Sequence, residues 1–242
     1  MPLQGERGIF SAEQVEAAIR PVTRYQPKTR LVSVEQTSNM GGGTLWPLQT
    51  IREVCSVAHQ NRLLTHMDGA RLRNAVVATH IPAKEFAASF DSVWIDFSKG
   101  LGAPVGAALA GSNEFILEAW QWKQRLGGAM RQAGIIAAAG VYALRHHVDR
   151  LAVDHENAKV LANGLAELRG ITLNPREVET NIVIFDVTKT GKTSREIADR
   201  FLEHGLRMSV ASPTRLRAVT HLDIVKKDVE EALRIVKKVQ ET

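Results

Sequence analysis

Asp68 and Lys99 are the two residues whose chemistry draws attention, because each follows a short apolar stretch and precedes a turn. A lysine amine can bond covalently to a carbonyl carbon, and a carboxylate can hold a protonated ring nitrogen beside it. Pyridoxal phosphate requires both groups, a lysine for its aldehyde and a carboxylate for its pyridine nitrogen. The alternative is a salt bridge between Asp68 and Lys99. The two residue types and their spacing favour the two interpretations equally.

The segments before these residues predict how they are positioned. Strand-like runs end near Glu35, Asp68 and Lys99, which are 33 and 31 residues apart (68 − 35 and 99 − 68). That spacing is typical of a strand, a crossover helix and the next parallel strand. The sequence therefore predicts an α/β fold with these three residues at one sheet edge, where ligands bind in open sheets. Glycines after Lys99 predict a turn that backbone and cofactor approach closely.

The second half of the chain follows a different pattern. Helical periodicity over residues 113–126, 130–147 and 148–168 is followed by short strands and two amphipathic helices. We expect a large cofactor-binding α/β domain over residues 1–147. Residues 148–242 are predicted to form a small α+β domain that begins with a connecting helix.

Composition excludes several classes of protein. The 242 residues are 44% hydrophobic and 24% charged, which is ordinary for a soluble globular protein. The net charge of +5 is spread over the chain and accompanies no nucleic-acid-binding motif, so no nucleic-acid partner is expected. Cys55, the single cysteine, is predicted to be buried and excludes an intramolecular disulfide. No signal peptide or membrane span is recognisable, and we expect a cytoplasmic protein.

Three further patterns were weighed for ligand binding. None of the eight histidines has the spacing of a zinc site, so no metal is expected. The segment "TKTGKTS" (188–194) has Asp186 where a nucleotide-binding loop requires glycine, which favours a solvated turn. The segment "NMGGGT" (39–44) is equally compatible with an anion-binding loop and with a flexible connection.

Five short segments, in order along the chain, carry a family resemblance. Together they resemble the threonine aldolase branch of the pyridoxal-phosphate-dependent β-eliminating lyases, from about Gly8 to the C-terminus. The resemblance resolves the choice left open by Asp68 and Lys99 in favour of the cofactor. It also implies the fold of the pyridoxal-phosphate-dependent transferases, fold type I. The segments are "HMDGARLRNA" (66–75), "SKGLGAPVG" (98–106), "GGAMRQAG" (127–134), "VETNIV" (178–183) and "RAVTH" (217–221).

The resemblance also implies roles for individual residues. Lys99 matches the lysine that forms the Schiff base, and Asp68 matches the partner of the pyridine nitrogen. Arg71 matches an arginine near the cofactor ring and the substrate carboxylate. Arg217 matches the small-domain arginine that grips this carboxylate, a task that suits its planar fork. Arg131 matches a family arginine at a subunit boundary and is included among the expected substrate-binding residues.

Four other residues near the expected site are singled out. The Ser98 hydroxyl is expected to donate a hydrogen bond to the cofactor phosphate. Glu35 and Asn39 lie in a segment similar to the family's loop beside the cofactor. Asp96 is a carboxylate within a strand expected to be central, and the sequence gives no partner for it.

The chain departs from the family at its start and inside one motif. The family has a longer N-terminal portion with a phosphate-binding glycine-threonine loop and a ring-stacking histidine, and we expect this chain to begin after both. Arg73 stands where the family usually has an apolar or aromatic residue. An inactive homologue that serves only as an oligomer partner is therefore one alternative.

The main hypothesis is a carbon–carbon lyase that cleaves L-threonine or L-allo-threonine to glycine and an aldehyde. Such an enzyme would act in amino-acid metabolism, in glycine biosynthesis and threonine catabolism. Another fold type I amino-acid lyase, a racemase or a transaminase is the remaining alternative. The family implies a homodimer or homotetramer. The helix around "AGIIAAAGVYAL" suits close packing in such an assembly, and an internal core helix explains its composition equally well.

Overall fold

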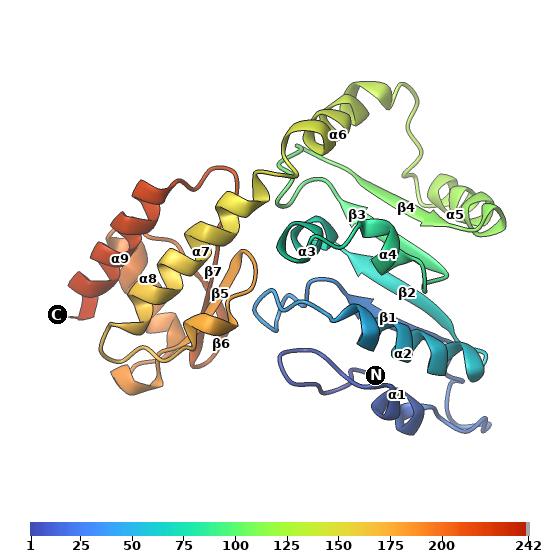
Figure 1. The fold of residues 1–242 in the computed structure, drawn as a ribbon, viewed down its shortest axis with the longest axis horizontal. Coiled ribbons are helices and arrows are strands. Elements are labelled where there is room, and N and C mark those ends of the chain that lie inside the picture. The colour runs from blue at the N-terminus through green and yellow to red at the C-terminus, as the bar shows by residue number, and fades with distance from the viewer. Residues whose placement is uncertain (241–242) are drawn as a thin grey trace.

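The structure, a computed structural model, describes residues 1–240 and contains two β-sheets that lie side by side (Figure 1). The larger sheet has the order β1-β2-β3-β4. Its first three strands are parallel and β4 is antiparallel to β3. The strands are β1 (Leu31–Glu35), β2 (Leu64–Gly69), β3 (Ser92–Asp96) and β4 (Ala107–Gly111).

Helices flank the larger sheet and precede the smaller one. Pro47 and Pro82 stand immediately before α2 and α4, where a missing backbone N–H costs nothing. Pro82 thereby divides the helical stretch after β2 into two helices. The helices are α1 (Ala12–Ala18), α2 (Leu48–Gln60), α3 (Leu72–Thr79), α4 (Ala83–Ala87), α5 (Asn113–Arg125) and α6 (Gly134–His146).

The C-terminal part is a small antiparallel domain. Its sheet has the order β5-β7-β6, and its core includes buried residues of α7, α8 and α9. The mostly parallel sheet with flanking helices and this small α+β domain confirm the predicted fold class. Residues 241–242 of the predicted small domain lie outside the described residues. The elements are β5 (Ile182–Asp186), β6 (Ser209–Ser212), β7 (Arg215–Val219), α7 (Leu151–Ala166), α8 (Ser194–Glu203) and α9 (Lys226–Gln240).

Burial of α2 follows its helical period. Ile51, Val54, Cys55 and Ala58 are all buried and contribute to a core shared with β1 and β2. Burial raises the pKa of the Cys55 thiol to about 12. Cys55 is therefore an unreactive core residue, as predicted.

The register of the parallel strands sets the position of the candidate site. Glu35 at the end of β1 is paired with Asp68 on β2, and Asp68 is paired with Trp94 on β3. Lys99 follows three residues after the end of β3. The strand ends therefore meet at one edge, as the spacing predicted, and this edge faces the small domain (Figure 1).

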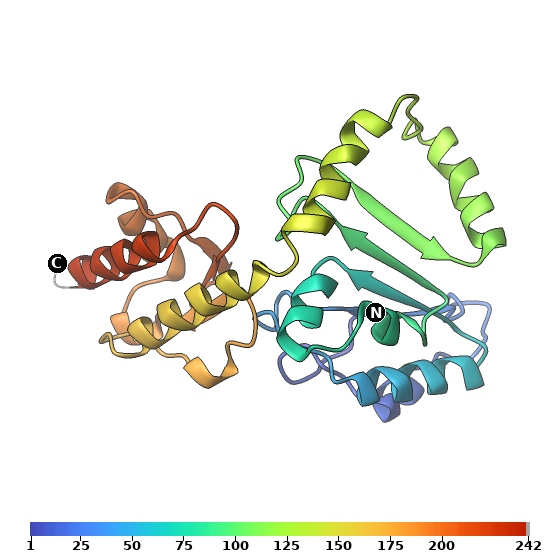
Figure 2. The same cartoon turned by 45° about the horizontal axis from the view of Figure 1, so that its top comes forward.

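The part of the larger sheet around β4, at the end away from β1, is mostly exposed. Every residue of β4 is exposed, α5 contains no buried residue, and α6 buries only Gly140 and Ala143. Figure 2 shows α5 and α6, in yellow-green, beyond β4 at the end of the sheet away from β1. The interpretation of α6 as an internal core helix is therefore wrong for this structure, because most of its apolar side chains have no neighbours to cover them.

No helix within residues 1–240 combines the length and the apolar character needed to cross a membrane.

Candidate active site

Lys99 projects from the turn after β3, with 39% of its side chain exposed. Its Nζ lies 3.1 Å from Asp96 Oδ2 and 5.2 Å from the centre of the Trp94 ring. Asp96 is thus the ionic partner of Lys99, and the alternative salt bridge to Asp68 does not form. This partner of Asp96 could not be predicted, because a contact across a turn cannot be inferred from strand alternation.

Asp68 lies one residue before the end of β2, beside the start of α3. Its Oδ1 accepts a hydrogen bond from the Ala70 N–H at 3.0 Å. Its Oδ2 accepts no hydrogen bond from the described residues. The carboxylate is therefore held by one oxygen and offers the other, which is the arrangement that a protonated ring nitrogen requires.

Two arginines from distant parts of the sequence converge on one amide oxygen. Asn39 Oδ1 accepts hydrogen bonds from Arg71 at 3.3 Å and from Arg217 at 2.8 Å. The Asn39 N–H donates to Glu35 Oε2 at 2.8 Å, which fixes the loop that carries it. Arg71 comes from the start of α3, whereas Arg217 comes from β7 of the small domain.

The charges and burial of Arg71 and Arg217 favour binding of an anion between them. Burial lowers the pKa of Arg71, and the charge of Arg217 lowers it further, against the opposing carboxylate of Glu35. Burial also lowers the pKa of Arg217, and its Nε is buried without a hydrogen-bond partner. Two partly desolvated guanidinium groups around one neutral oxygen favour replacement of that oxygen by a carboxylate.

A cleft of about 420 Å³ lies between the turn that carries Lys99 and the segment after β7. Its wall includes two of the predicted cofactor ligands besides Lys99, and five residues of the small domain. Neither Asp68, Arg217 nor Arg131 lines it. Lining residues that the chemistry can use are Arg71, Ser98, Lys99, Asn181, Val219 and His221.

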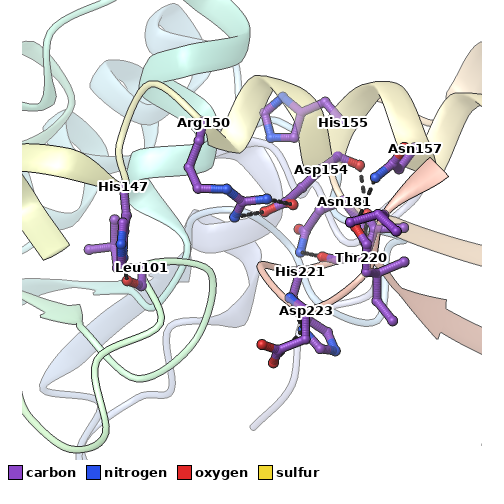
Figure 3. A network of polar contacts seen from close by, with 12 residues as sticks. Leu101, His147, Arg150, Asp154, His155, Asn157, Asn181, Thr220, His221 and Asp223 are labelled. Atoms are coloured by element: carbon purple, nitrogen blue, oxygen red, sulfur yellow. Dashed lines mark hydrogen bonds and ion pairs between the residues drawn. The ribbon is translucent and has the colours of Figure 1, made fainter. Parts of the chain in front are cut away.

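Gly102 lets the small domain approach the Lys99 turn. It has a φ of +69°, and a Cβ there would lie 2.7 Å from Leu222 Cδ2. The His147 ring also anchors this turn through Nδ1, which lies 2.6 Å from the Leu101 carbonyl oxygen (Figure 3). The glycine was expected to make room for the cofactor; in the structure it makes room for the small domain.

A buried polar network fixes the segment that carries Arg217 and His221 (Figure 3). The Thr220 hydroxyl donates to the Asp154 carbonyl oxygen at 2.6 Å, and the Asn181 Nδ2 donates to the Thr220 carbonyl oxygen at 2.8 Å. The Asp154 carboxylate is fully buried and is held by both terminal nitrogens of Arg150, at 2.7 and 3.3 Å. Thr220 points away from the cleft, so that Val219 and His221 on either side of it face the cleft.

Sequence reasoning did not assign Asn181 or His221 to the cleft. Both occur in segments that carried the family resemblance, "VETNIV" and "RAVTH". The period-two alternation from Arg217 through Val219 to His221 contained the signal, since these residues share one face of the strand and its extension.

The glycine-rich segment 39–44 is an ordered connection. The Gly43 N–H donates to the Ser38 carbonyl oxygen at 2.8 Å, and the Gly42 N–H donates to the Asn39 carbonyl oxygen at 3.2 Å. These amides are not directed at an external anion. The Gly43 carbonyl oxygen instead accepts from the buried Thr180 hydroxyl at 2.7 Å, which joins the loop to the small domain. The anion-binding interpretation is wrong for these two amides.

Arg131 is not brought to the site. It lies exposed in the connection between α5 and α6. Arg215, two residues before Arg217 on the same strand, is also exposed, with its Nε 3.9 Å from Asp186 Oδ2. Of these three arginines the structure places only Arg217 against Asn39.

The residues at the strand ends fit pyridoxal phosphate. An amine lies on the cleft wall, a carboxylate with a free oxygen lies on the adjacent strand, and a partly buried arginine pair holds an unpaired donor, Arg217 Nε. Among the described residues no group of histidine, cysteine and carboxylate side chains could hold a metal ion.

Comparison with known proteins agrees with this geometry. Residues 1–189 match the family described as beta-eliminating lyase. The chain belongs to this family. It is similar to low-specificity L-threonine aldolase 1 of Arabidopsis thaliana, with 36% identity over 231 residues. That match covers 94% of this chain and 64% of the relative, so the chain spans just under two thirds of the relative's length.

Solved structures of the same fold include a threonine aldolase of Leishmania major and a mutant aspartate aminotransferase of Thermus thermophilus. The first has a TM-score of 0.79 with 19% identity, and the match covers 98% of this chain and 69% of that one. The second has a TM-score of 0.75 with 17% identity, and covers 97% and 64%. The chain has the fold of type I pyridoxal-phosphate enzymes, and members of its family depend on that cofactor.

Proposed function

We propose that this protein is a pyridoxal-phosphate-dependent carbon–carbon lyase that cleaves L-threonine or L-allo-threonine to glycine and acetaldehyde. The observation that carries the proposal is the meeting of Lys99, Asp68 and the Arg71–Arg217 pair at one edge of the parallel sheet. The Arabidopsis relative, a threonine aldolase, favours this reaction over an inactive oligomer partner and over other fold type I chemistry.

Three residues would hold the cofactor. The Lys99 amine would bond to its aldehyde carbon, and the free Oδ2 of Asp68 would hold its ring nitrogen protonated. The Ser98 hydroxyl, on the cleft wall, would donate to its phosphate. When bound, the cofactor supplies an electron sink for the pair released as a bond to the substrate α-carbon breaks.

The arginine pair would bind and orient the substrate. Arg217 and Arg71 approach the same oxygen from two directions, so a carboxylate between them is held by charge-assisted hydrogen bonds from both sides. Fixing the carboxylate in this way orients the bonds around the α-carbon relative to Lys99. The Lys99 amine, on the cleft wall, would then be the group that returns a proton to the α-carbon.

We also propose the larger organisation of the protein. The chain divides into a cofactor-binding domain over residues 1–147 and a small domain over 148–242, a division that two separate hydrophobic cores support. The exposed apolar side chains of β4, α5 and α6 support assembly into a homodimer or homotetramer, with Arg131 at a subunit boundary. A role in threonine catabolism and glycine formation in the cytoplasm would follow from the proposed reaction.

Reconstitution with pyridoxal phosphate tests the reaction. The loaded protein is expected to release glycine and acetaldehyde from L-threonine or L-allo-threonine. Borohydride reduction followed by peptide mapping should place the cofactor on Lys99. Lys99→Ala should lower the cleavage rate by about three orders of magnitude or more, because the covalent attachment point is lost.

Lys123→Ala is a matched control. Lys123 lies on α5 with its Nζ 5.2 Å from the centre of the Trp120 ring, as Lys99 lies 5.2 Å from that of Trp94. This variant should keep wild-type cleavage. A reduced cofactor adduct on other lysines but none on Lys99, or full cleavage by Lys99→Ala, would contradict the proposal.

A further inference from the structure

Asp96 is the carboxylate that the proposed function leaves without a task. It ends β3, and only 15% of its side chain is exposed. Its Oδ1 accepts a hydrogen bond from the Ser98 N–H at 2.7 Å, which fixes the carboxylate across the turn. Its Oδ2 is directed at Lys99 Nζ, 3.1 Å away.

Several features separate this contact from a surface ion pair. Exposed ion pairs join two long, mobile side chains, whereas the Asp96 carboxylate is short, mostly buried and tied to the backbone. No second carboxylate of the described residues lies within ion-pair distance of Lys99 Nζ. Asp68, on the neighbouring strand, accepts the Ala70 N–H through Oδ1 and forms no ion pair with Lys99.

The chemistry expected of Lys99 requires such a partner. An ammonium group has no lone pair and cannot attack a carbonyl carbon until it loses a proton. A proton acceptor acts efficiently when it lies about 2.6–3.2 Å from the atom that loses the proton. Asp96 Oδ2 meets that condition, at 3.1 Å.

We propose that Asp96 is a catalytic residue in the loading of Lys99, relaying a proton between Nζ and the oxygen of the incoming aldehyde. The proposal rests on the proposed function, since it assumes that Lys99 receives the cofactor aldehyde. The Lys99 ammonium first passes a proton to Asp96 Oδ2. The Nζ lone pair then attacks the aldehyde carbon, and the carbonyl π electrons move to oxygen.

The second half of the step returns the proton. A proton moves from nitrogen to the new alkoxide and gives a hydroxyl group. The Asp96 carboxylic acid then protonates this hydroxyl, the C–O bond breaks, and water leaves as the C=N bond forms. Asp96 ends the step as a carboxylate, and the nitrogen keeps its remaining proton and positive charge. No oxidant, reductant or metal is required.

Asp96→Asn tests the relay with little change in shape. The asparagine keeps an Oδ1 that accepts from the Ser98 N–H but cannot take up a proton. Cofactor-free protein would be mixed with pyridoxal 5′-phosphate, and the absorbance of the lysine adduct followed in time. Borohydride trapping and peptide mapping would assign the adduct to Lys99. We expect the rate of adduct formation to fall about 100-fold.

Asp186→Asn is the matched control. Asp186 ends β5, accepts the Thr188 N–H through Oδ1 at 2.8 Å, and faces Arg215, so it repeats the local design of Asp96 outside the site. This variant should form the adduct at the wild-type rate. Asp96→Glu should recover part of the lost rate, because a carboxylate is restored at a changed distance.

The outcomes separate the relay from the proposed function. If the wild-type protein forms no adduct on Lys99, both proposals fail. If the wild-type protein forms it and Asp96→Asn does so as fast or faster, only the relay is overturned. Far-UV circular dichroism and the thermal midpoint of Asp96→Asn identify a slow rate caused by misfolding. A slow rate in a variant that is folded like the wild type supports the relay.

Discussion

The start of α7 and the outer helices α5 and α6 are built in opposite ways. At the start of α7, Leu151 and Asp154 are fully buried, and His155 is nearly so. Their partners come from the larger sheet's helices and from the small domain (Figure 3). On α5 no side chain is buried, although five of its residues are large and apolar, and four of these are exposed. The first region joins two parts of the molecule, whereas most of the apolar surface of the second is left uncovered by residues 1–240.

The difference shows where positional accuracy comes from in this fold. Hydrogen bonds in the buried joint run from Arg150 and Asp154 through Thr220 to Asn181, and these residues hold the strand that carries Arg217. Polar groups in a buried joint are directional, and each must find its partner. The exposed apolar side chains of the outer helices can associate with another apolar surface, but such contacts do not specify a unique orientation. Substitutions in the joint should therefore affect both stability and the site, and those on the outer helices neither.

Among substitutions of charged residues, Asp154→Ala is expected to have the largest effect on the free energy of unfolding. It removes a fully buried carboxylate and leaves the partly buried Arg150 without its partner. A loss of about 3 kcal/mol is expected, at the low end for a broken buried pair because Arg150 reaches solvent. Urea denaturation of the variant and the wild type measures it.

Glu231→Ala provides the matched comparison for Asp154→Ala. Glu231 pairs with Arg234 within α9, and both side chains are largely exposed. This variant should lose less than about 1 kcal/mol. Equal losses for the two variants would remove the distinction between a buried joint and an ordinary helix surface.

His155 should make the joint sensitive to acid. Burial lowers the pKa of His155 from 6.5 to about 4, and Nε2 lies 3.1 Å from Asn74 Nδ2. Below pH 6.5 the unfolded chain binds a proton that the folded chain refuses. The free energy of unfolding is therefore not reduced by His155 above pH 6.5, and it decreases as the pH falls from 6.5 towards 4. The total is about 3 kcal/mol, or about 1.4 kcal/mol for each pH unit.

Urea denaturation at pH 7 and pH 5 measures this effect. The wild type should lose about 2 kcal/mol more between these pH values than His155→Gln. His146→Gln, at an exposed position on α6, should behave as the wild type. A wild-type loss no greater than that of His155→Gln would show that His155 is not held neutral.

The smallest effect is expected on the outer helices. Within a single chain Leu117 on α5 is 68% exposed, so Leu117→Lys should change the free energy of unfolding of the monomer by no more than about 0.5 kcal/mol. Leu165→Ala on α7, at a fully buried position, should cost about 2–5 kcal/mol. A large loss for Leu117→Lys, together with a lower mass in light scattering, would show that a second copy covers this surface.

The sequence predicted the parts of the structure that depend on local pattern. Apolar periodicity located the strands and helices, and the spacing of Glu35, Asp68 and Lys99 placed them at one sheet edge, as the register confirms. Pro82 marked the break between α3 and α4. These features depend on backbone geometry and on residues close in sequence, which a pattern records directly.

The sequence alone did not predict side-chain contacts between distant segments or across the turn after β3. Nothing local in "SVWID" or "SKG" assigns Asp96 to Lys99, and nothing in "TSN" shows that Asn39 meets arginines 32 and 178 residues away. The sequence left open whether α6 is an internal core helix or an assembly surface, because composition shows that a helix is apolar without showing what covers it. The roles of Lys99, Asp68, Ser98 and the arginines remain predictions that chemistry must test.

Asn39 has a consequence for affinity. Its amide oxygen already accepts hydrogen bonds from both arginines, so the carboxylate of the proposed substrate would replace one acceptor by another. The count of hydrogen bonds barely changes in that exchange, and the gain comes from a full negative charge meeting two positive ones. A ligand whose carboxylate has been converted to an uncharged amide would bring the same geometry and almost none of that gain. The Asn39 side chain would therefore compete with ligands for the two arginines, and only an anionic ligand would gain binding free energy by displacing it.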